Sequence, residues 1–172
     1  HRVAICEQLE NPKLTKKIVK RGVTDVITPG VSLNDEILDK KENNFLAAIN
    51  LNKNRVGVAF LDISTGEFLV GKGSIDYSLN LLQTFNPKEI LIIKKDVSAF
   101  TEKGINKEYF FYVDEWMSNI TTSFEKIKNH FKVKSLKGFG INNDCQGIIP
   151  ASIILHYLED SHKKNLSHIT KL

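Results

Sequence analysis

An α/β fold is predicted for this chain of 172 residues. The prediction rests on three observations. The sequence has three β-rich runs separated by short polar turns, two helical patterns that each have one apolar face, and one continuous apolar run. Hydrophobic residues make up 41% and charged residues 26%, which favours a packed core over disorder.

The chain begins with two short strand candidates, Val3–Cys6 and Val23–Ile27, and the second ends at the stop signal Thr28-Pro29-Gly30. Two strands cannot bury a core alone. Because the first residue is His1 and no leader follows it, residues 1–28 are interpreted as the end of a domain that begins upstream.

Residues 29–42 are mostly polar and are interpreted as a linker, with Ser32 as the cap of a short helix through Leu38. A regular pattern starts at Asn43. The runs Phe45–Leu51, Val56–Ile63 and Phe68–Val70 are separated by short polar stretches, which predicts a three-strand antiparallel meander.

A helix is predicted next. Ser74 is its expected cap and Asn86-Pro87 ends it. Its apolar positions share one face: Ile75, Leu79, Leu82 and Phe85. The run Ile90–Ile93 predicts a strand buried on both faces, Val97–Phe100 a short helix, and Tyr109–Val113 a fifth strand.

The clearest helical pattern follows Asp114, which is the expected cap of a helix over residues 114–131. Its apolar stripe has 3-4-3-4 spacing: Met117, Ile120, Phe124, Ile127 and Phe131. A last helix is predicted to start near Pro150 and to turn four residues inward, namely Ala151, Ile154, Leu155 and Leu158.

Three meander strands followed by helices that alternate with two more strands is the element order of a ribonuclease-H-like α/β fold. A nuclease of that fold needs carboxylates that hold two metal ions, the first in the first strand. Phe45–Leu51 carries no acid, and Asp62 leads directly into a hairpin, where an Asp usually bonds its own turn. A metal-dependent nuclease therefore stays the alternative function.

Other catalytic patterns are incomplete. Gly138-Phe139-Gly140 lacks the third glycine of a dinucleotide loop and is interpreted as a chain reversal, and no phosphate-binding Walker pattern occurs. The histidines and the two cysteines, Cys6 and Cys145, have no metal-type spacing, which favours a reduced cytosolic setting. We therefore predict no catalytic residue, metal site or cofactor in this chain. The sequence has no run of 18 or more apolar residues, so no transmembrane helix is predicted.

The net charge of +4 is modest, but the stretch from Pro12 to Thr24 holds five cations and no acid: Lys13, Lys16, Lys17, Lys20 and Arg21. Such a stretch is expected to be an exposed loop. Composition alone leaves two interpretations open, a solvated loop or a loop that faces the DNA backbone.

Six segments in order carry a family resemblance: Val3–Gln8, Val26–Gly30, Asn44–Ile49, Leu61–Phe68, Asn86–Ile90 and Gly138–Gly140. They resemble the MutS family of bacterial DNA mismatch repair sensors, over essentially the whole chain. The resemblance implies that residues 1–28 end the mismatch-recognition domain and that 29–42 is the linker. It further implies that 43–165 is the connector domain, of ribonuclease-H-like fold, and that 166–172 starts the core and lever region.

In that family the wedging Phe-x-Glu motif lies upstream and the ATPase lies downstream. The resemblance therefore implies a parent protein that is a cytoplasmic, homodimeric, DNA-dependent ATPase using ATP and Mg, whereas this section is no enzyme. It also implies that the connector relays signals between the ATPase and DNA-binding ends and docks MutL. Glu125, Lys126 and Asn129 are the predicted docking residues, with charges at the first two where the family would have uncharged amides.

Overall fold

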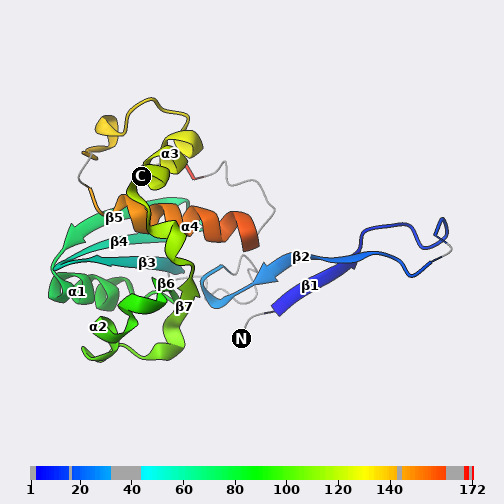
Figure 1. Cartoon of the computed structure of the whole chain (residues 1–172), viewed down its shortest axis with the longest axis horizontal. Coiled ribbons are helices and arrows are strands. Elements are labelled where there is room, and N and C mark those ends of the chain that lie inside the picture. The colour runs from blue at the N-terminus through cyan, green and yellow to red at the C-terminus, as the bar shows by residue number, and fades with distance from the viewer. Residues whose placement is uncertain (1–2, 16, 32–43, 143–144, 162–168, 171) are drawn as a thin grey trace.

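The computed structural model describes residues 3–15, 17–31, 44–142, 145–161, 169–170 and 172. It is a mixed α/β structure with a two-stranded and a five-stranded sheet. The antiparallel hairpin of β1 (Val3–Gln8) and β2 (Arg21–Ile27) projects from the side of the five-stranded unit (Figure 1). A 3-10 turn, Pro29–Val31, follows the hairpin. The helix predicted from Ser32 falls outside the described residues.

The five-stranded sheet contains the predicted meander of β3 (Phe45–Asn52), β4 (Arg55–Asp62) and β5 (Glu67–Gly73). Strand β6 (Glu89–Ile93) pairs parallel to β3, and β7 (Phe110–Val113) pairs parallel to β6. The strand order is therefore β5-β4-β3-β6-β7. β3 has partners on both edges, which agrees with the buried, almost wholly apolar sequence of this central strand.

Helix α1 (Ile75–Phe85) has the predicted ends. The Ser74 hydroxyl accepts a hydrogen bond from the Tyr77 amide at 3.2 Å, and Asn86 leaves the helix in the left-handed region at φ 43°. The short helix α2 (Val97–Thr101) also lies where it was predicted.

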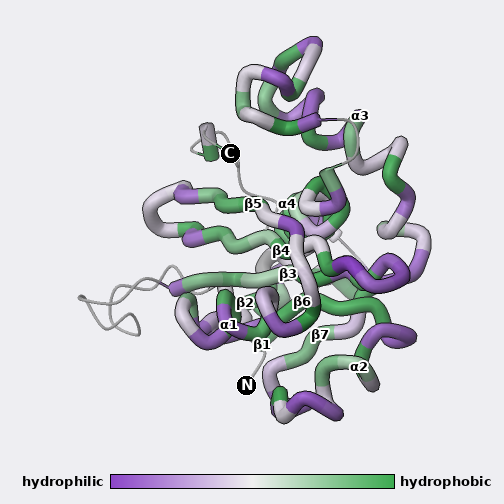
Figure 2. Tube along the Cα trace, turned by 90° about the vertical axis from the view of Figure 1, so that its left-hand side faces the viewer, coloured by the Kyte–Doolittle hydropathy of each residue, from purple (hydrophilic) through white to green (hydrophobic). Residues whose placement is uncertain are grey.

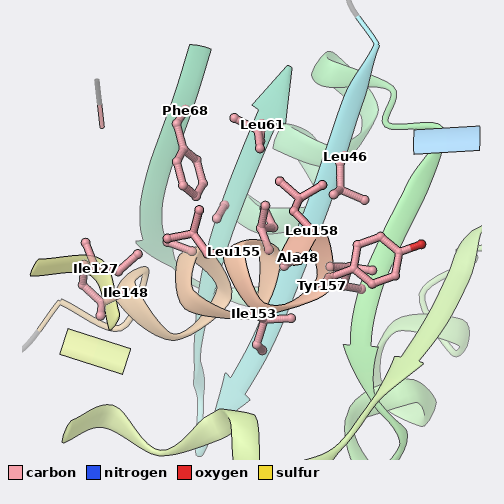
Figure 3. Close-up of a cluster of buried hydrophobic side chains, with 14 of the residues drawn as sticks. Leu46, Ala48, Leu61, Phe68, Ile127, Ile148, Ile153, Leu155, Tyr157 and Leu158 are labelled. Carbon is pink, nitrogen blue, oxygen red and sulfur yellow. The ribbon is translucent and has the colours of Figure 1, made fainter. Parts of the chain in front are cut away.

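Helices cover both faces of the sheet (Figure 1). Helices α1 and α2 lie on one face, where Leu82 and Phe100 pack against Phe60 and Ile92 of the strands. Helix α4 (Ile148–Ser161) lies on the other face, and its apolar side chains meet those of β3, β4 and β5 (Figure 3). Helix α3 (Ile120–Phe131) packs outside α4. Hydrophilic and hydrophobic residues alternate along the outlying segment that carries α3 (Figure 2).

The helix predicted over 114–131 is wrong at its start. Residues Glu115–Ser118 form a separate 3-10 turn, and α3 begins at Ile120. The actual cap is Asn119, whose side-chain oxygen accepts hydrogen bonds from the amides of Thr121 and Thr122 at 3.0 and 3.2 Å. Asn119 has extended backbone angles, so it ends one element and caps the next. As a consequence Ile120 of the predicted stripe is 39% exposed.

Helix α4 begins at Ile148, two residues earlier than predicted. A proline in the first turn is tolerated because the first four helical amides have no partner within the helix. The predicted inward residues are all buried, and so are Ile149 and Ile153 on other sides of the helix. α4 is buried nearly all round because the sheet lies on one side and α3 on another.

Candidate docking surface and basic loop

Asp62, the acid considered for metal chemistry, is bound into its own turn. Its Oδ1 accepts hydrogen bonds from the Ser64 amide at 2.9 Å and the Ser64 hydroxyl at 2.6 Å. The residue has no exposed surface. Within the part of the chain that the structure describes, no three His, Cys, Asp or Glu side chains are grouped so that they could hold a metal ion. The arrangement of Asp62 is that of a turn residue.

The predicted chain reversal at Gly138-Phe139-Gly140 is confirmed. Lys137–Phe139 form a 3-10 turn that Gly140 ends in the left-handed region, at φ 73°. A side chain at Gly140 would be strained there. Among the described helices, none is long and apolar enough to cross a membrane.

The predicted docking residues lie on α3 but do not share one environment. Glu125 and Asn129 are exposed. Lys126 turns toward α4, where it forms an ion pair with Glu159, and its side chain is only 19% exposed. Its expected place on a free polar face was wrong, because α3 packs on α4 along the side that carries Lys126. Glu125 instead pairs with Lys128, one turn further along α3.

A groove of about 330 Å³ follows the outer side of α3, and we call it the α3 groove. Its apolar lining consists of Ile120, Phe124, Leu136 and Ile141. Its charged lining is Glu125, Lys128, Lys134 and Lys137, so cations outnumber acids. Of the three predicted docking residues, only Glu125 is among the described lining residues. The groove can therefore bind an apolar side chain that is flanked by acceptors or acids.

His156 and Asp96 have shifted pKa values. Burial lowers the pKa of His156 on α4, and the nearby charge of Lys126 lowers it further, against the opposing effects of Glu159 and Asp160. Burial raises the pKa of Asp96, although the hydrogen bond that it accepts from the Leu51 amide at 3.0 Å opposes the shift.

Sequence reasoning missed Glu89, the first residue of β6, which is only 2% exposed. Its Oε1 accepts a hydrogen bond from the Tyr157 hydroxyl at 3.1 Å, and its Oε2 accepts one from the Gly30 amide at 3.4 Å. The available signal was an acid directly before an apolar run in a strand buried on both faces. That signal does not name the partners, which are 59 and 68 residues away.

The basic stretch forms the loop between β1 and β2, at the end of the hairpin far from the five-stranded sheet (Figure 1). Lys13, Lys17, Lys20 and Arg21 are exposed, as predicted, while Lys16 lies outside the described residues. Leu14 and Ile18 are also exposed, at 84% and 97%. The loop lies far from α3, so the two candidate sites are separate (Figure 1).

Comparisons with known proteins cover both units. The family model described as MutS domain II matches residues 44–170, and the model described as MutS domain I matches residues 1–36. The DNA mismatch repair protein MutS of Christiangramia forsetii is 50% identical over 171 residues, which is 99% of this chain. The proteins of that name from Parabacteroides distasonis and Bacteroides thetaiotaomicron are 50% and 51% identical over the same share. The chain spans 20% of the length of each of these relatives.

Proposed function

Because this chain belongs to the MutS family of DNA mismatch repair proteins, we propose that it is a non-catalytic section of a mismatch sensor that docks MutL and relays signals. Residues 43–165 form the connector domain in this proposal, and 1–28 end the mismatch-recognition domain. Residues 29–42 link the two, and 166–172 lead into the core and lever region. The change from hairpin to five-stranded sheet near residue 44 supports this division.

We assign the connector to the ribonuclease-H-like fold. The support is topological: an antiparallel meander, β3 to β5, is extended on the β3 side by two parallel strands, β6 and β7. Catalysis by that fold is not part of the proposal. Asp62, the candidate acid, is wholly buried and bonded to its turn, so a substrate would have no access to it.

MutL docking is the function that the geometry supports best, and the α3 groove is the observation that carries it. A groove with an apolar lining and a charged rim matches the composition of protein interfaces, in which buried apolar anchors sit within a polar surround. It is formed by one helix and the segment after it, both on the outside of the molecule (Figure 1).

DNA contact is the second candidate, and the basic loop favours it. Its exposed cations can neutralise phosphates without reading sequence. ATP and Mg belong to the ATPase domain of the parent protein in this proposal, and the parent is a cytoplasmic homodimer. The loop would then add backbone affinity to a complex whose mismatch contacts are made elsewhere.

Titration of purified MutL with this chain tests the docking proposal. Saturable binding is expected. Lys134→Glu and Lys137→Glu should weaken it, because each reverses a cation that lines the α3 groove, while each changes stability by only about 0.5 kcal/mol or less because both sites are exposed. Lys107→Glu, an exposed change outside the α3 groove, is the matched control. Failure of the wild-type chain to bind, or binding by both groove variants as tight as that of the wild type, would contradict the proposal.

A further inference from the structure

The junction between the hairpin and the sheet is held by one buried carboxylate. Glu89 belongs to β6, accepts a hydrogen bond from Gly30 in the turn after the hairpin, and accepts another from Tyr157 on α4. Three elements that are distant in sequence therefore meet at one side chain. Leaving a buried hydrogen-bonding group without its partner costs free energy, so these hydrogen bonds hold the three elements together.

Gly30 is fitted to this place. A Cβ atom added at Gly30 would lie 2.9 Å from the Cβ of Glu89 and 3.0 Å from Cδ1 of Leu46. Contacts that short require the neighbours to shift, so the close approach of the turn to β6 depends on the absence of a side chain. Asn44 adds a second tie, because its amide nitrogen donates to the Pro29 carbonyl at 3.2 Å.

Packing at this junction is incomplete. A cavity of about 350 Å³ lies beside it, lined by Val26 and Thr28 from the hairpin end and by Met117 and Tyr157 from the five-stranded unit. β1 is exposed along its whole length. A densely packed interface would fix the hairpin by shape. With this cavity present, the directed hydrogen bonds of Glu89 have a larger share in fixing it.

Helix α4 continues from the junction to α3. Tyr157 meets Glu89, and two residues further along α4 Glu159 forms the ion pair with Lys126 of α3. Tyr157 is also held by the ring of Phe111, at 5.0 Å between centroids. The hydrogen bonds of Glu89 and the ion pair of Glu159 with Lys126 are thus joined through one rigid element, the backbone of α4, and a packed rigid element can carry coupling between two sites.

We propose that Glu89 is the positioning residue of the junction: through Gly30 and Tyr157 it sets the direction in which the hairpin leaves the sheet, and it ties that direction to α4 and so to α3. The functional role of Glu89 rests on the proposed function, in which the connector relays signals between domains. Glu89 does not itself contact MutL in this proposal. It acts only through the groups that it orients.

The test measures local opening and long-range geometry in the same set of variants. Glu89→Met keeps the length of the side chain and removes both acceptors, while Tyr157→Phe removes one hydroxyl and keeps the ring. Tyr112→Phe, at an exposed tyrosine of β7, is the matched control. Amide exchange at Gly30 should be about tenfold faster in Glu89→Met, and less accelerated in Tyr157→Phe.

Spin labels at Cys6 on the hairpin and at Asn129→Cys on α3, with Cys145→Ala, then report the distance between the two units by double electron–electron resonance. Both labelled positions are exposed. The distribution should be narrow in the parent and in Tyr112→Phe, and broader in Tyr157→Phe and Glu89→Met at temperatures well below melting. A role in stability alone would lower the melting temperature and leave this distribution unchanged.

Unchanged Gly30 exchange together with an unchanged distribution in Glu89→Met would overturn the inference, as would equal broadening in Tyr112→Phe. MutL binding is measured separately. Glu89→Met leaves the α3 groove intact, so it should bind MutL like the parent. If no variant and no parent chain binds MutL, the docking proposal fails, and the distance distributions still decide the role of Glu89.

Discussion

The indole ring of Trp116 stands edge-on to the imidazole ring of His156, with 5.2 Å between the centroids and 74° between the ring planes. Trp116 precedes α3 in the 3-10 turn, and His156 is on α4. Because Trp116 is the only tryptophan of the chain, its fluorescence reports directly on one titratable group of α4.

Protonated imidazole quenches indole fluorescence, so a pH titration of Trp116 emission should follow His156. We expect a midpoint below the ordinary histidine value of 6.5, since burial and Lys126 both disfavour the cation. Lys126→Met should move the midpoint of the titration upward, because it removes a nearby positive charge. Lys128→Met, two residues further along α3, should move the midpoint less. A midpoint above 6.5, or a titration that survives His156→Gln, would contradict this assignment.

The lowered pKa of His156 also makes the free energy of unfolding depend on pH. Well above pH 6.5 His156 is neutral in both the folded and the unfolded state and contributes nothing to the pH dependence. As the pH falls through 6.5 toward the lowered pKa of the folded state, the unfolded chain takes up the proton first, so the free energy of unfolding decreases. Denaturant melts of parent and His156→Gln at several pH values should diverge in that window and run parallel above it.

Asn119→Ala tests where α3 begins. Two amides of the first turn lose their side-chain acceptor, which should cost about 1 kcal/mol of unfolding free energy. Asp114→Ala should cost less, because Asp114 makes no cap hydrogen bond to the 3-10 turn that follows it. Chemical denaturation measures both. A larger loss of stability in Asp114→Ala than in Asn119→Ala would indicate that the helix starts at Asp114.

Gly57 on β4 faces the chain just before α4. A Cβ there would lie 2.3 Å from the carbonyl oxygen of Gln146, a backbone atom with little freedom to move. Gly57→Ala should therefore destabilise the protein by about 2 kcal/mol or more. At Gly138 an added Cβ meets nothing within 4 Å, so Gly138→Ala is the control and should be nearly neutral. Equal melting of the two variants would show that the close approach is absent.

DNA binding by this chain should be weak and indifferent to a mismatch. If the basic loop carries it, affinity should collapse between about 50 and 200 mM salt. Replacing Lys13, Lys17 and Lys20 by glutamine should flatten the salt dependence, and replacing Lys53, Lys88 and Lys107 should not. Fluorescence anisotropy with paired and mismatched duplexes measures this. A clear preference for the mismatched duplex over the paired duplex would contradict the prediction.

The meander and α1 were predictable because their signals are local. Hairpin turns, the cap at Ser74 and the stop at Asn86 act within a few residues of the element they bound. The break at Asn119 was not predictable from spacing, since the 3-4-3-4 pattern runs through it. Only the competition of the Asn119 side chain for the first amides decides where α3 starts.

The candidate site was predicted only in part, because its remaining features depend on tertiary contacts. The basic loop followed from composition and lies where it was expected. The pairing of Lys126 with Glu159, 33 residues apart, needs the packing of α3 on α4. The α3 groove likewise needs the chain reversal at Gly140, which brings Leu136 and Ile141 beside Phe124.

Amide hydrogen exchange of this chain with and without MutL tests the central claim most directly, because it shows where the partner binds without any substitution. The account predicts protection concentrated in residues 120–141, over α3 and the rest of the α3 groove, with α1 and residues 103–109 on the other face of the sheet unchanged. Protection confined to that other face, or no protection anywhere at saturating MutL, would contradict docking at the α3 groove.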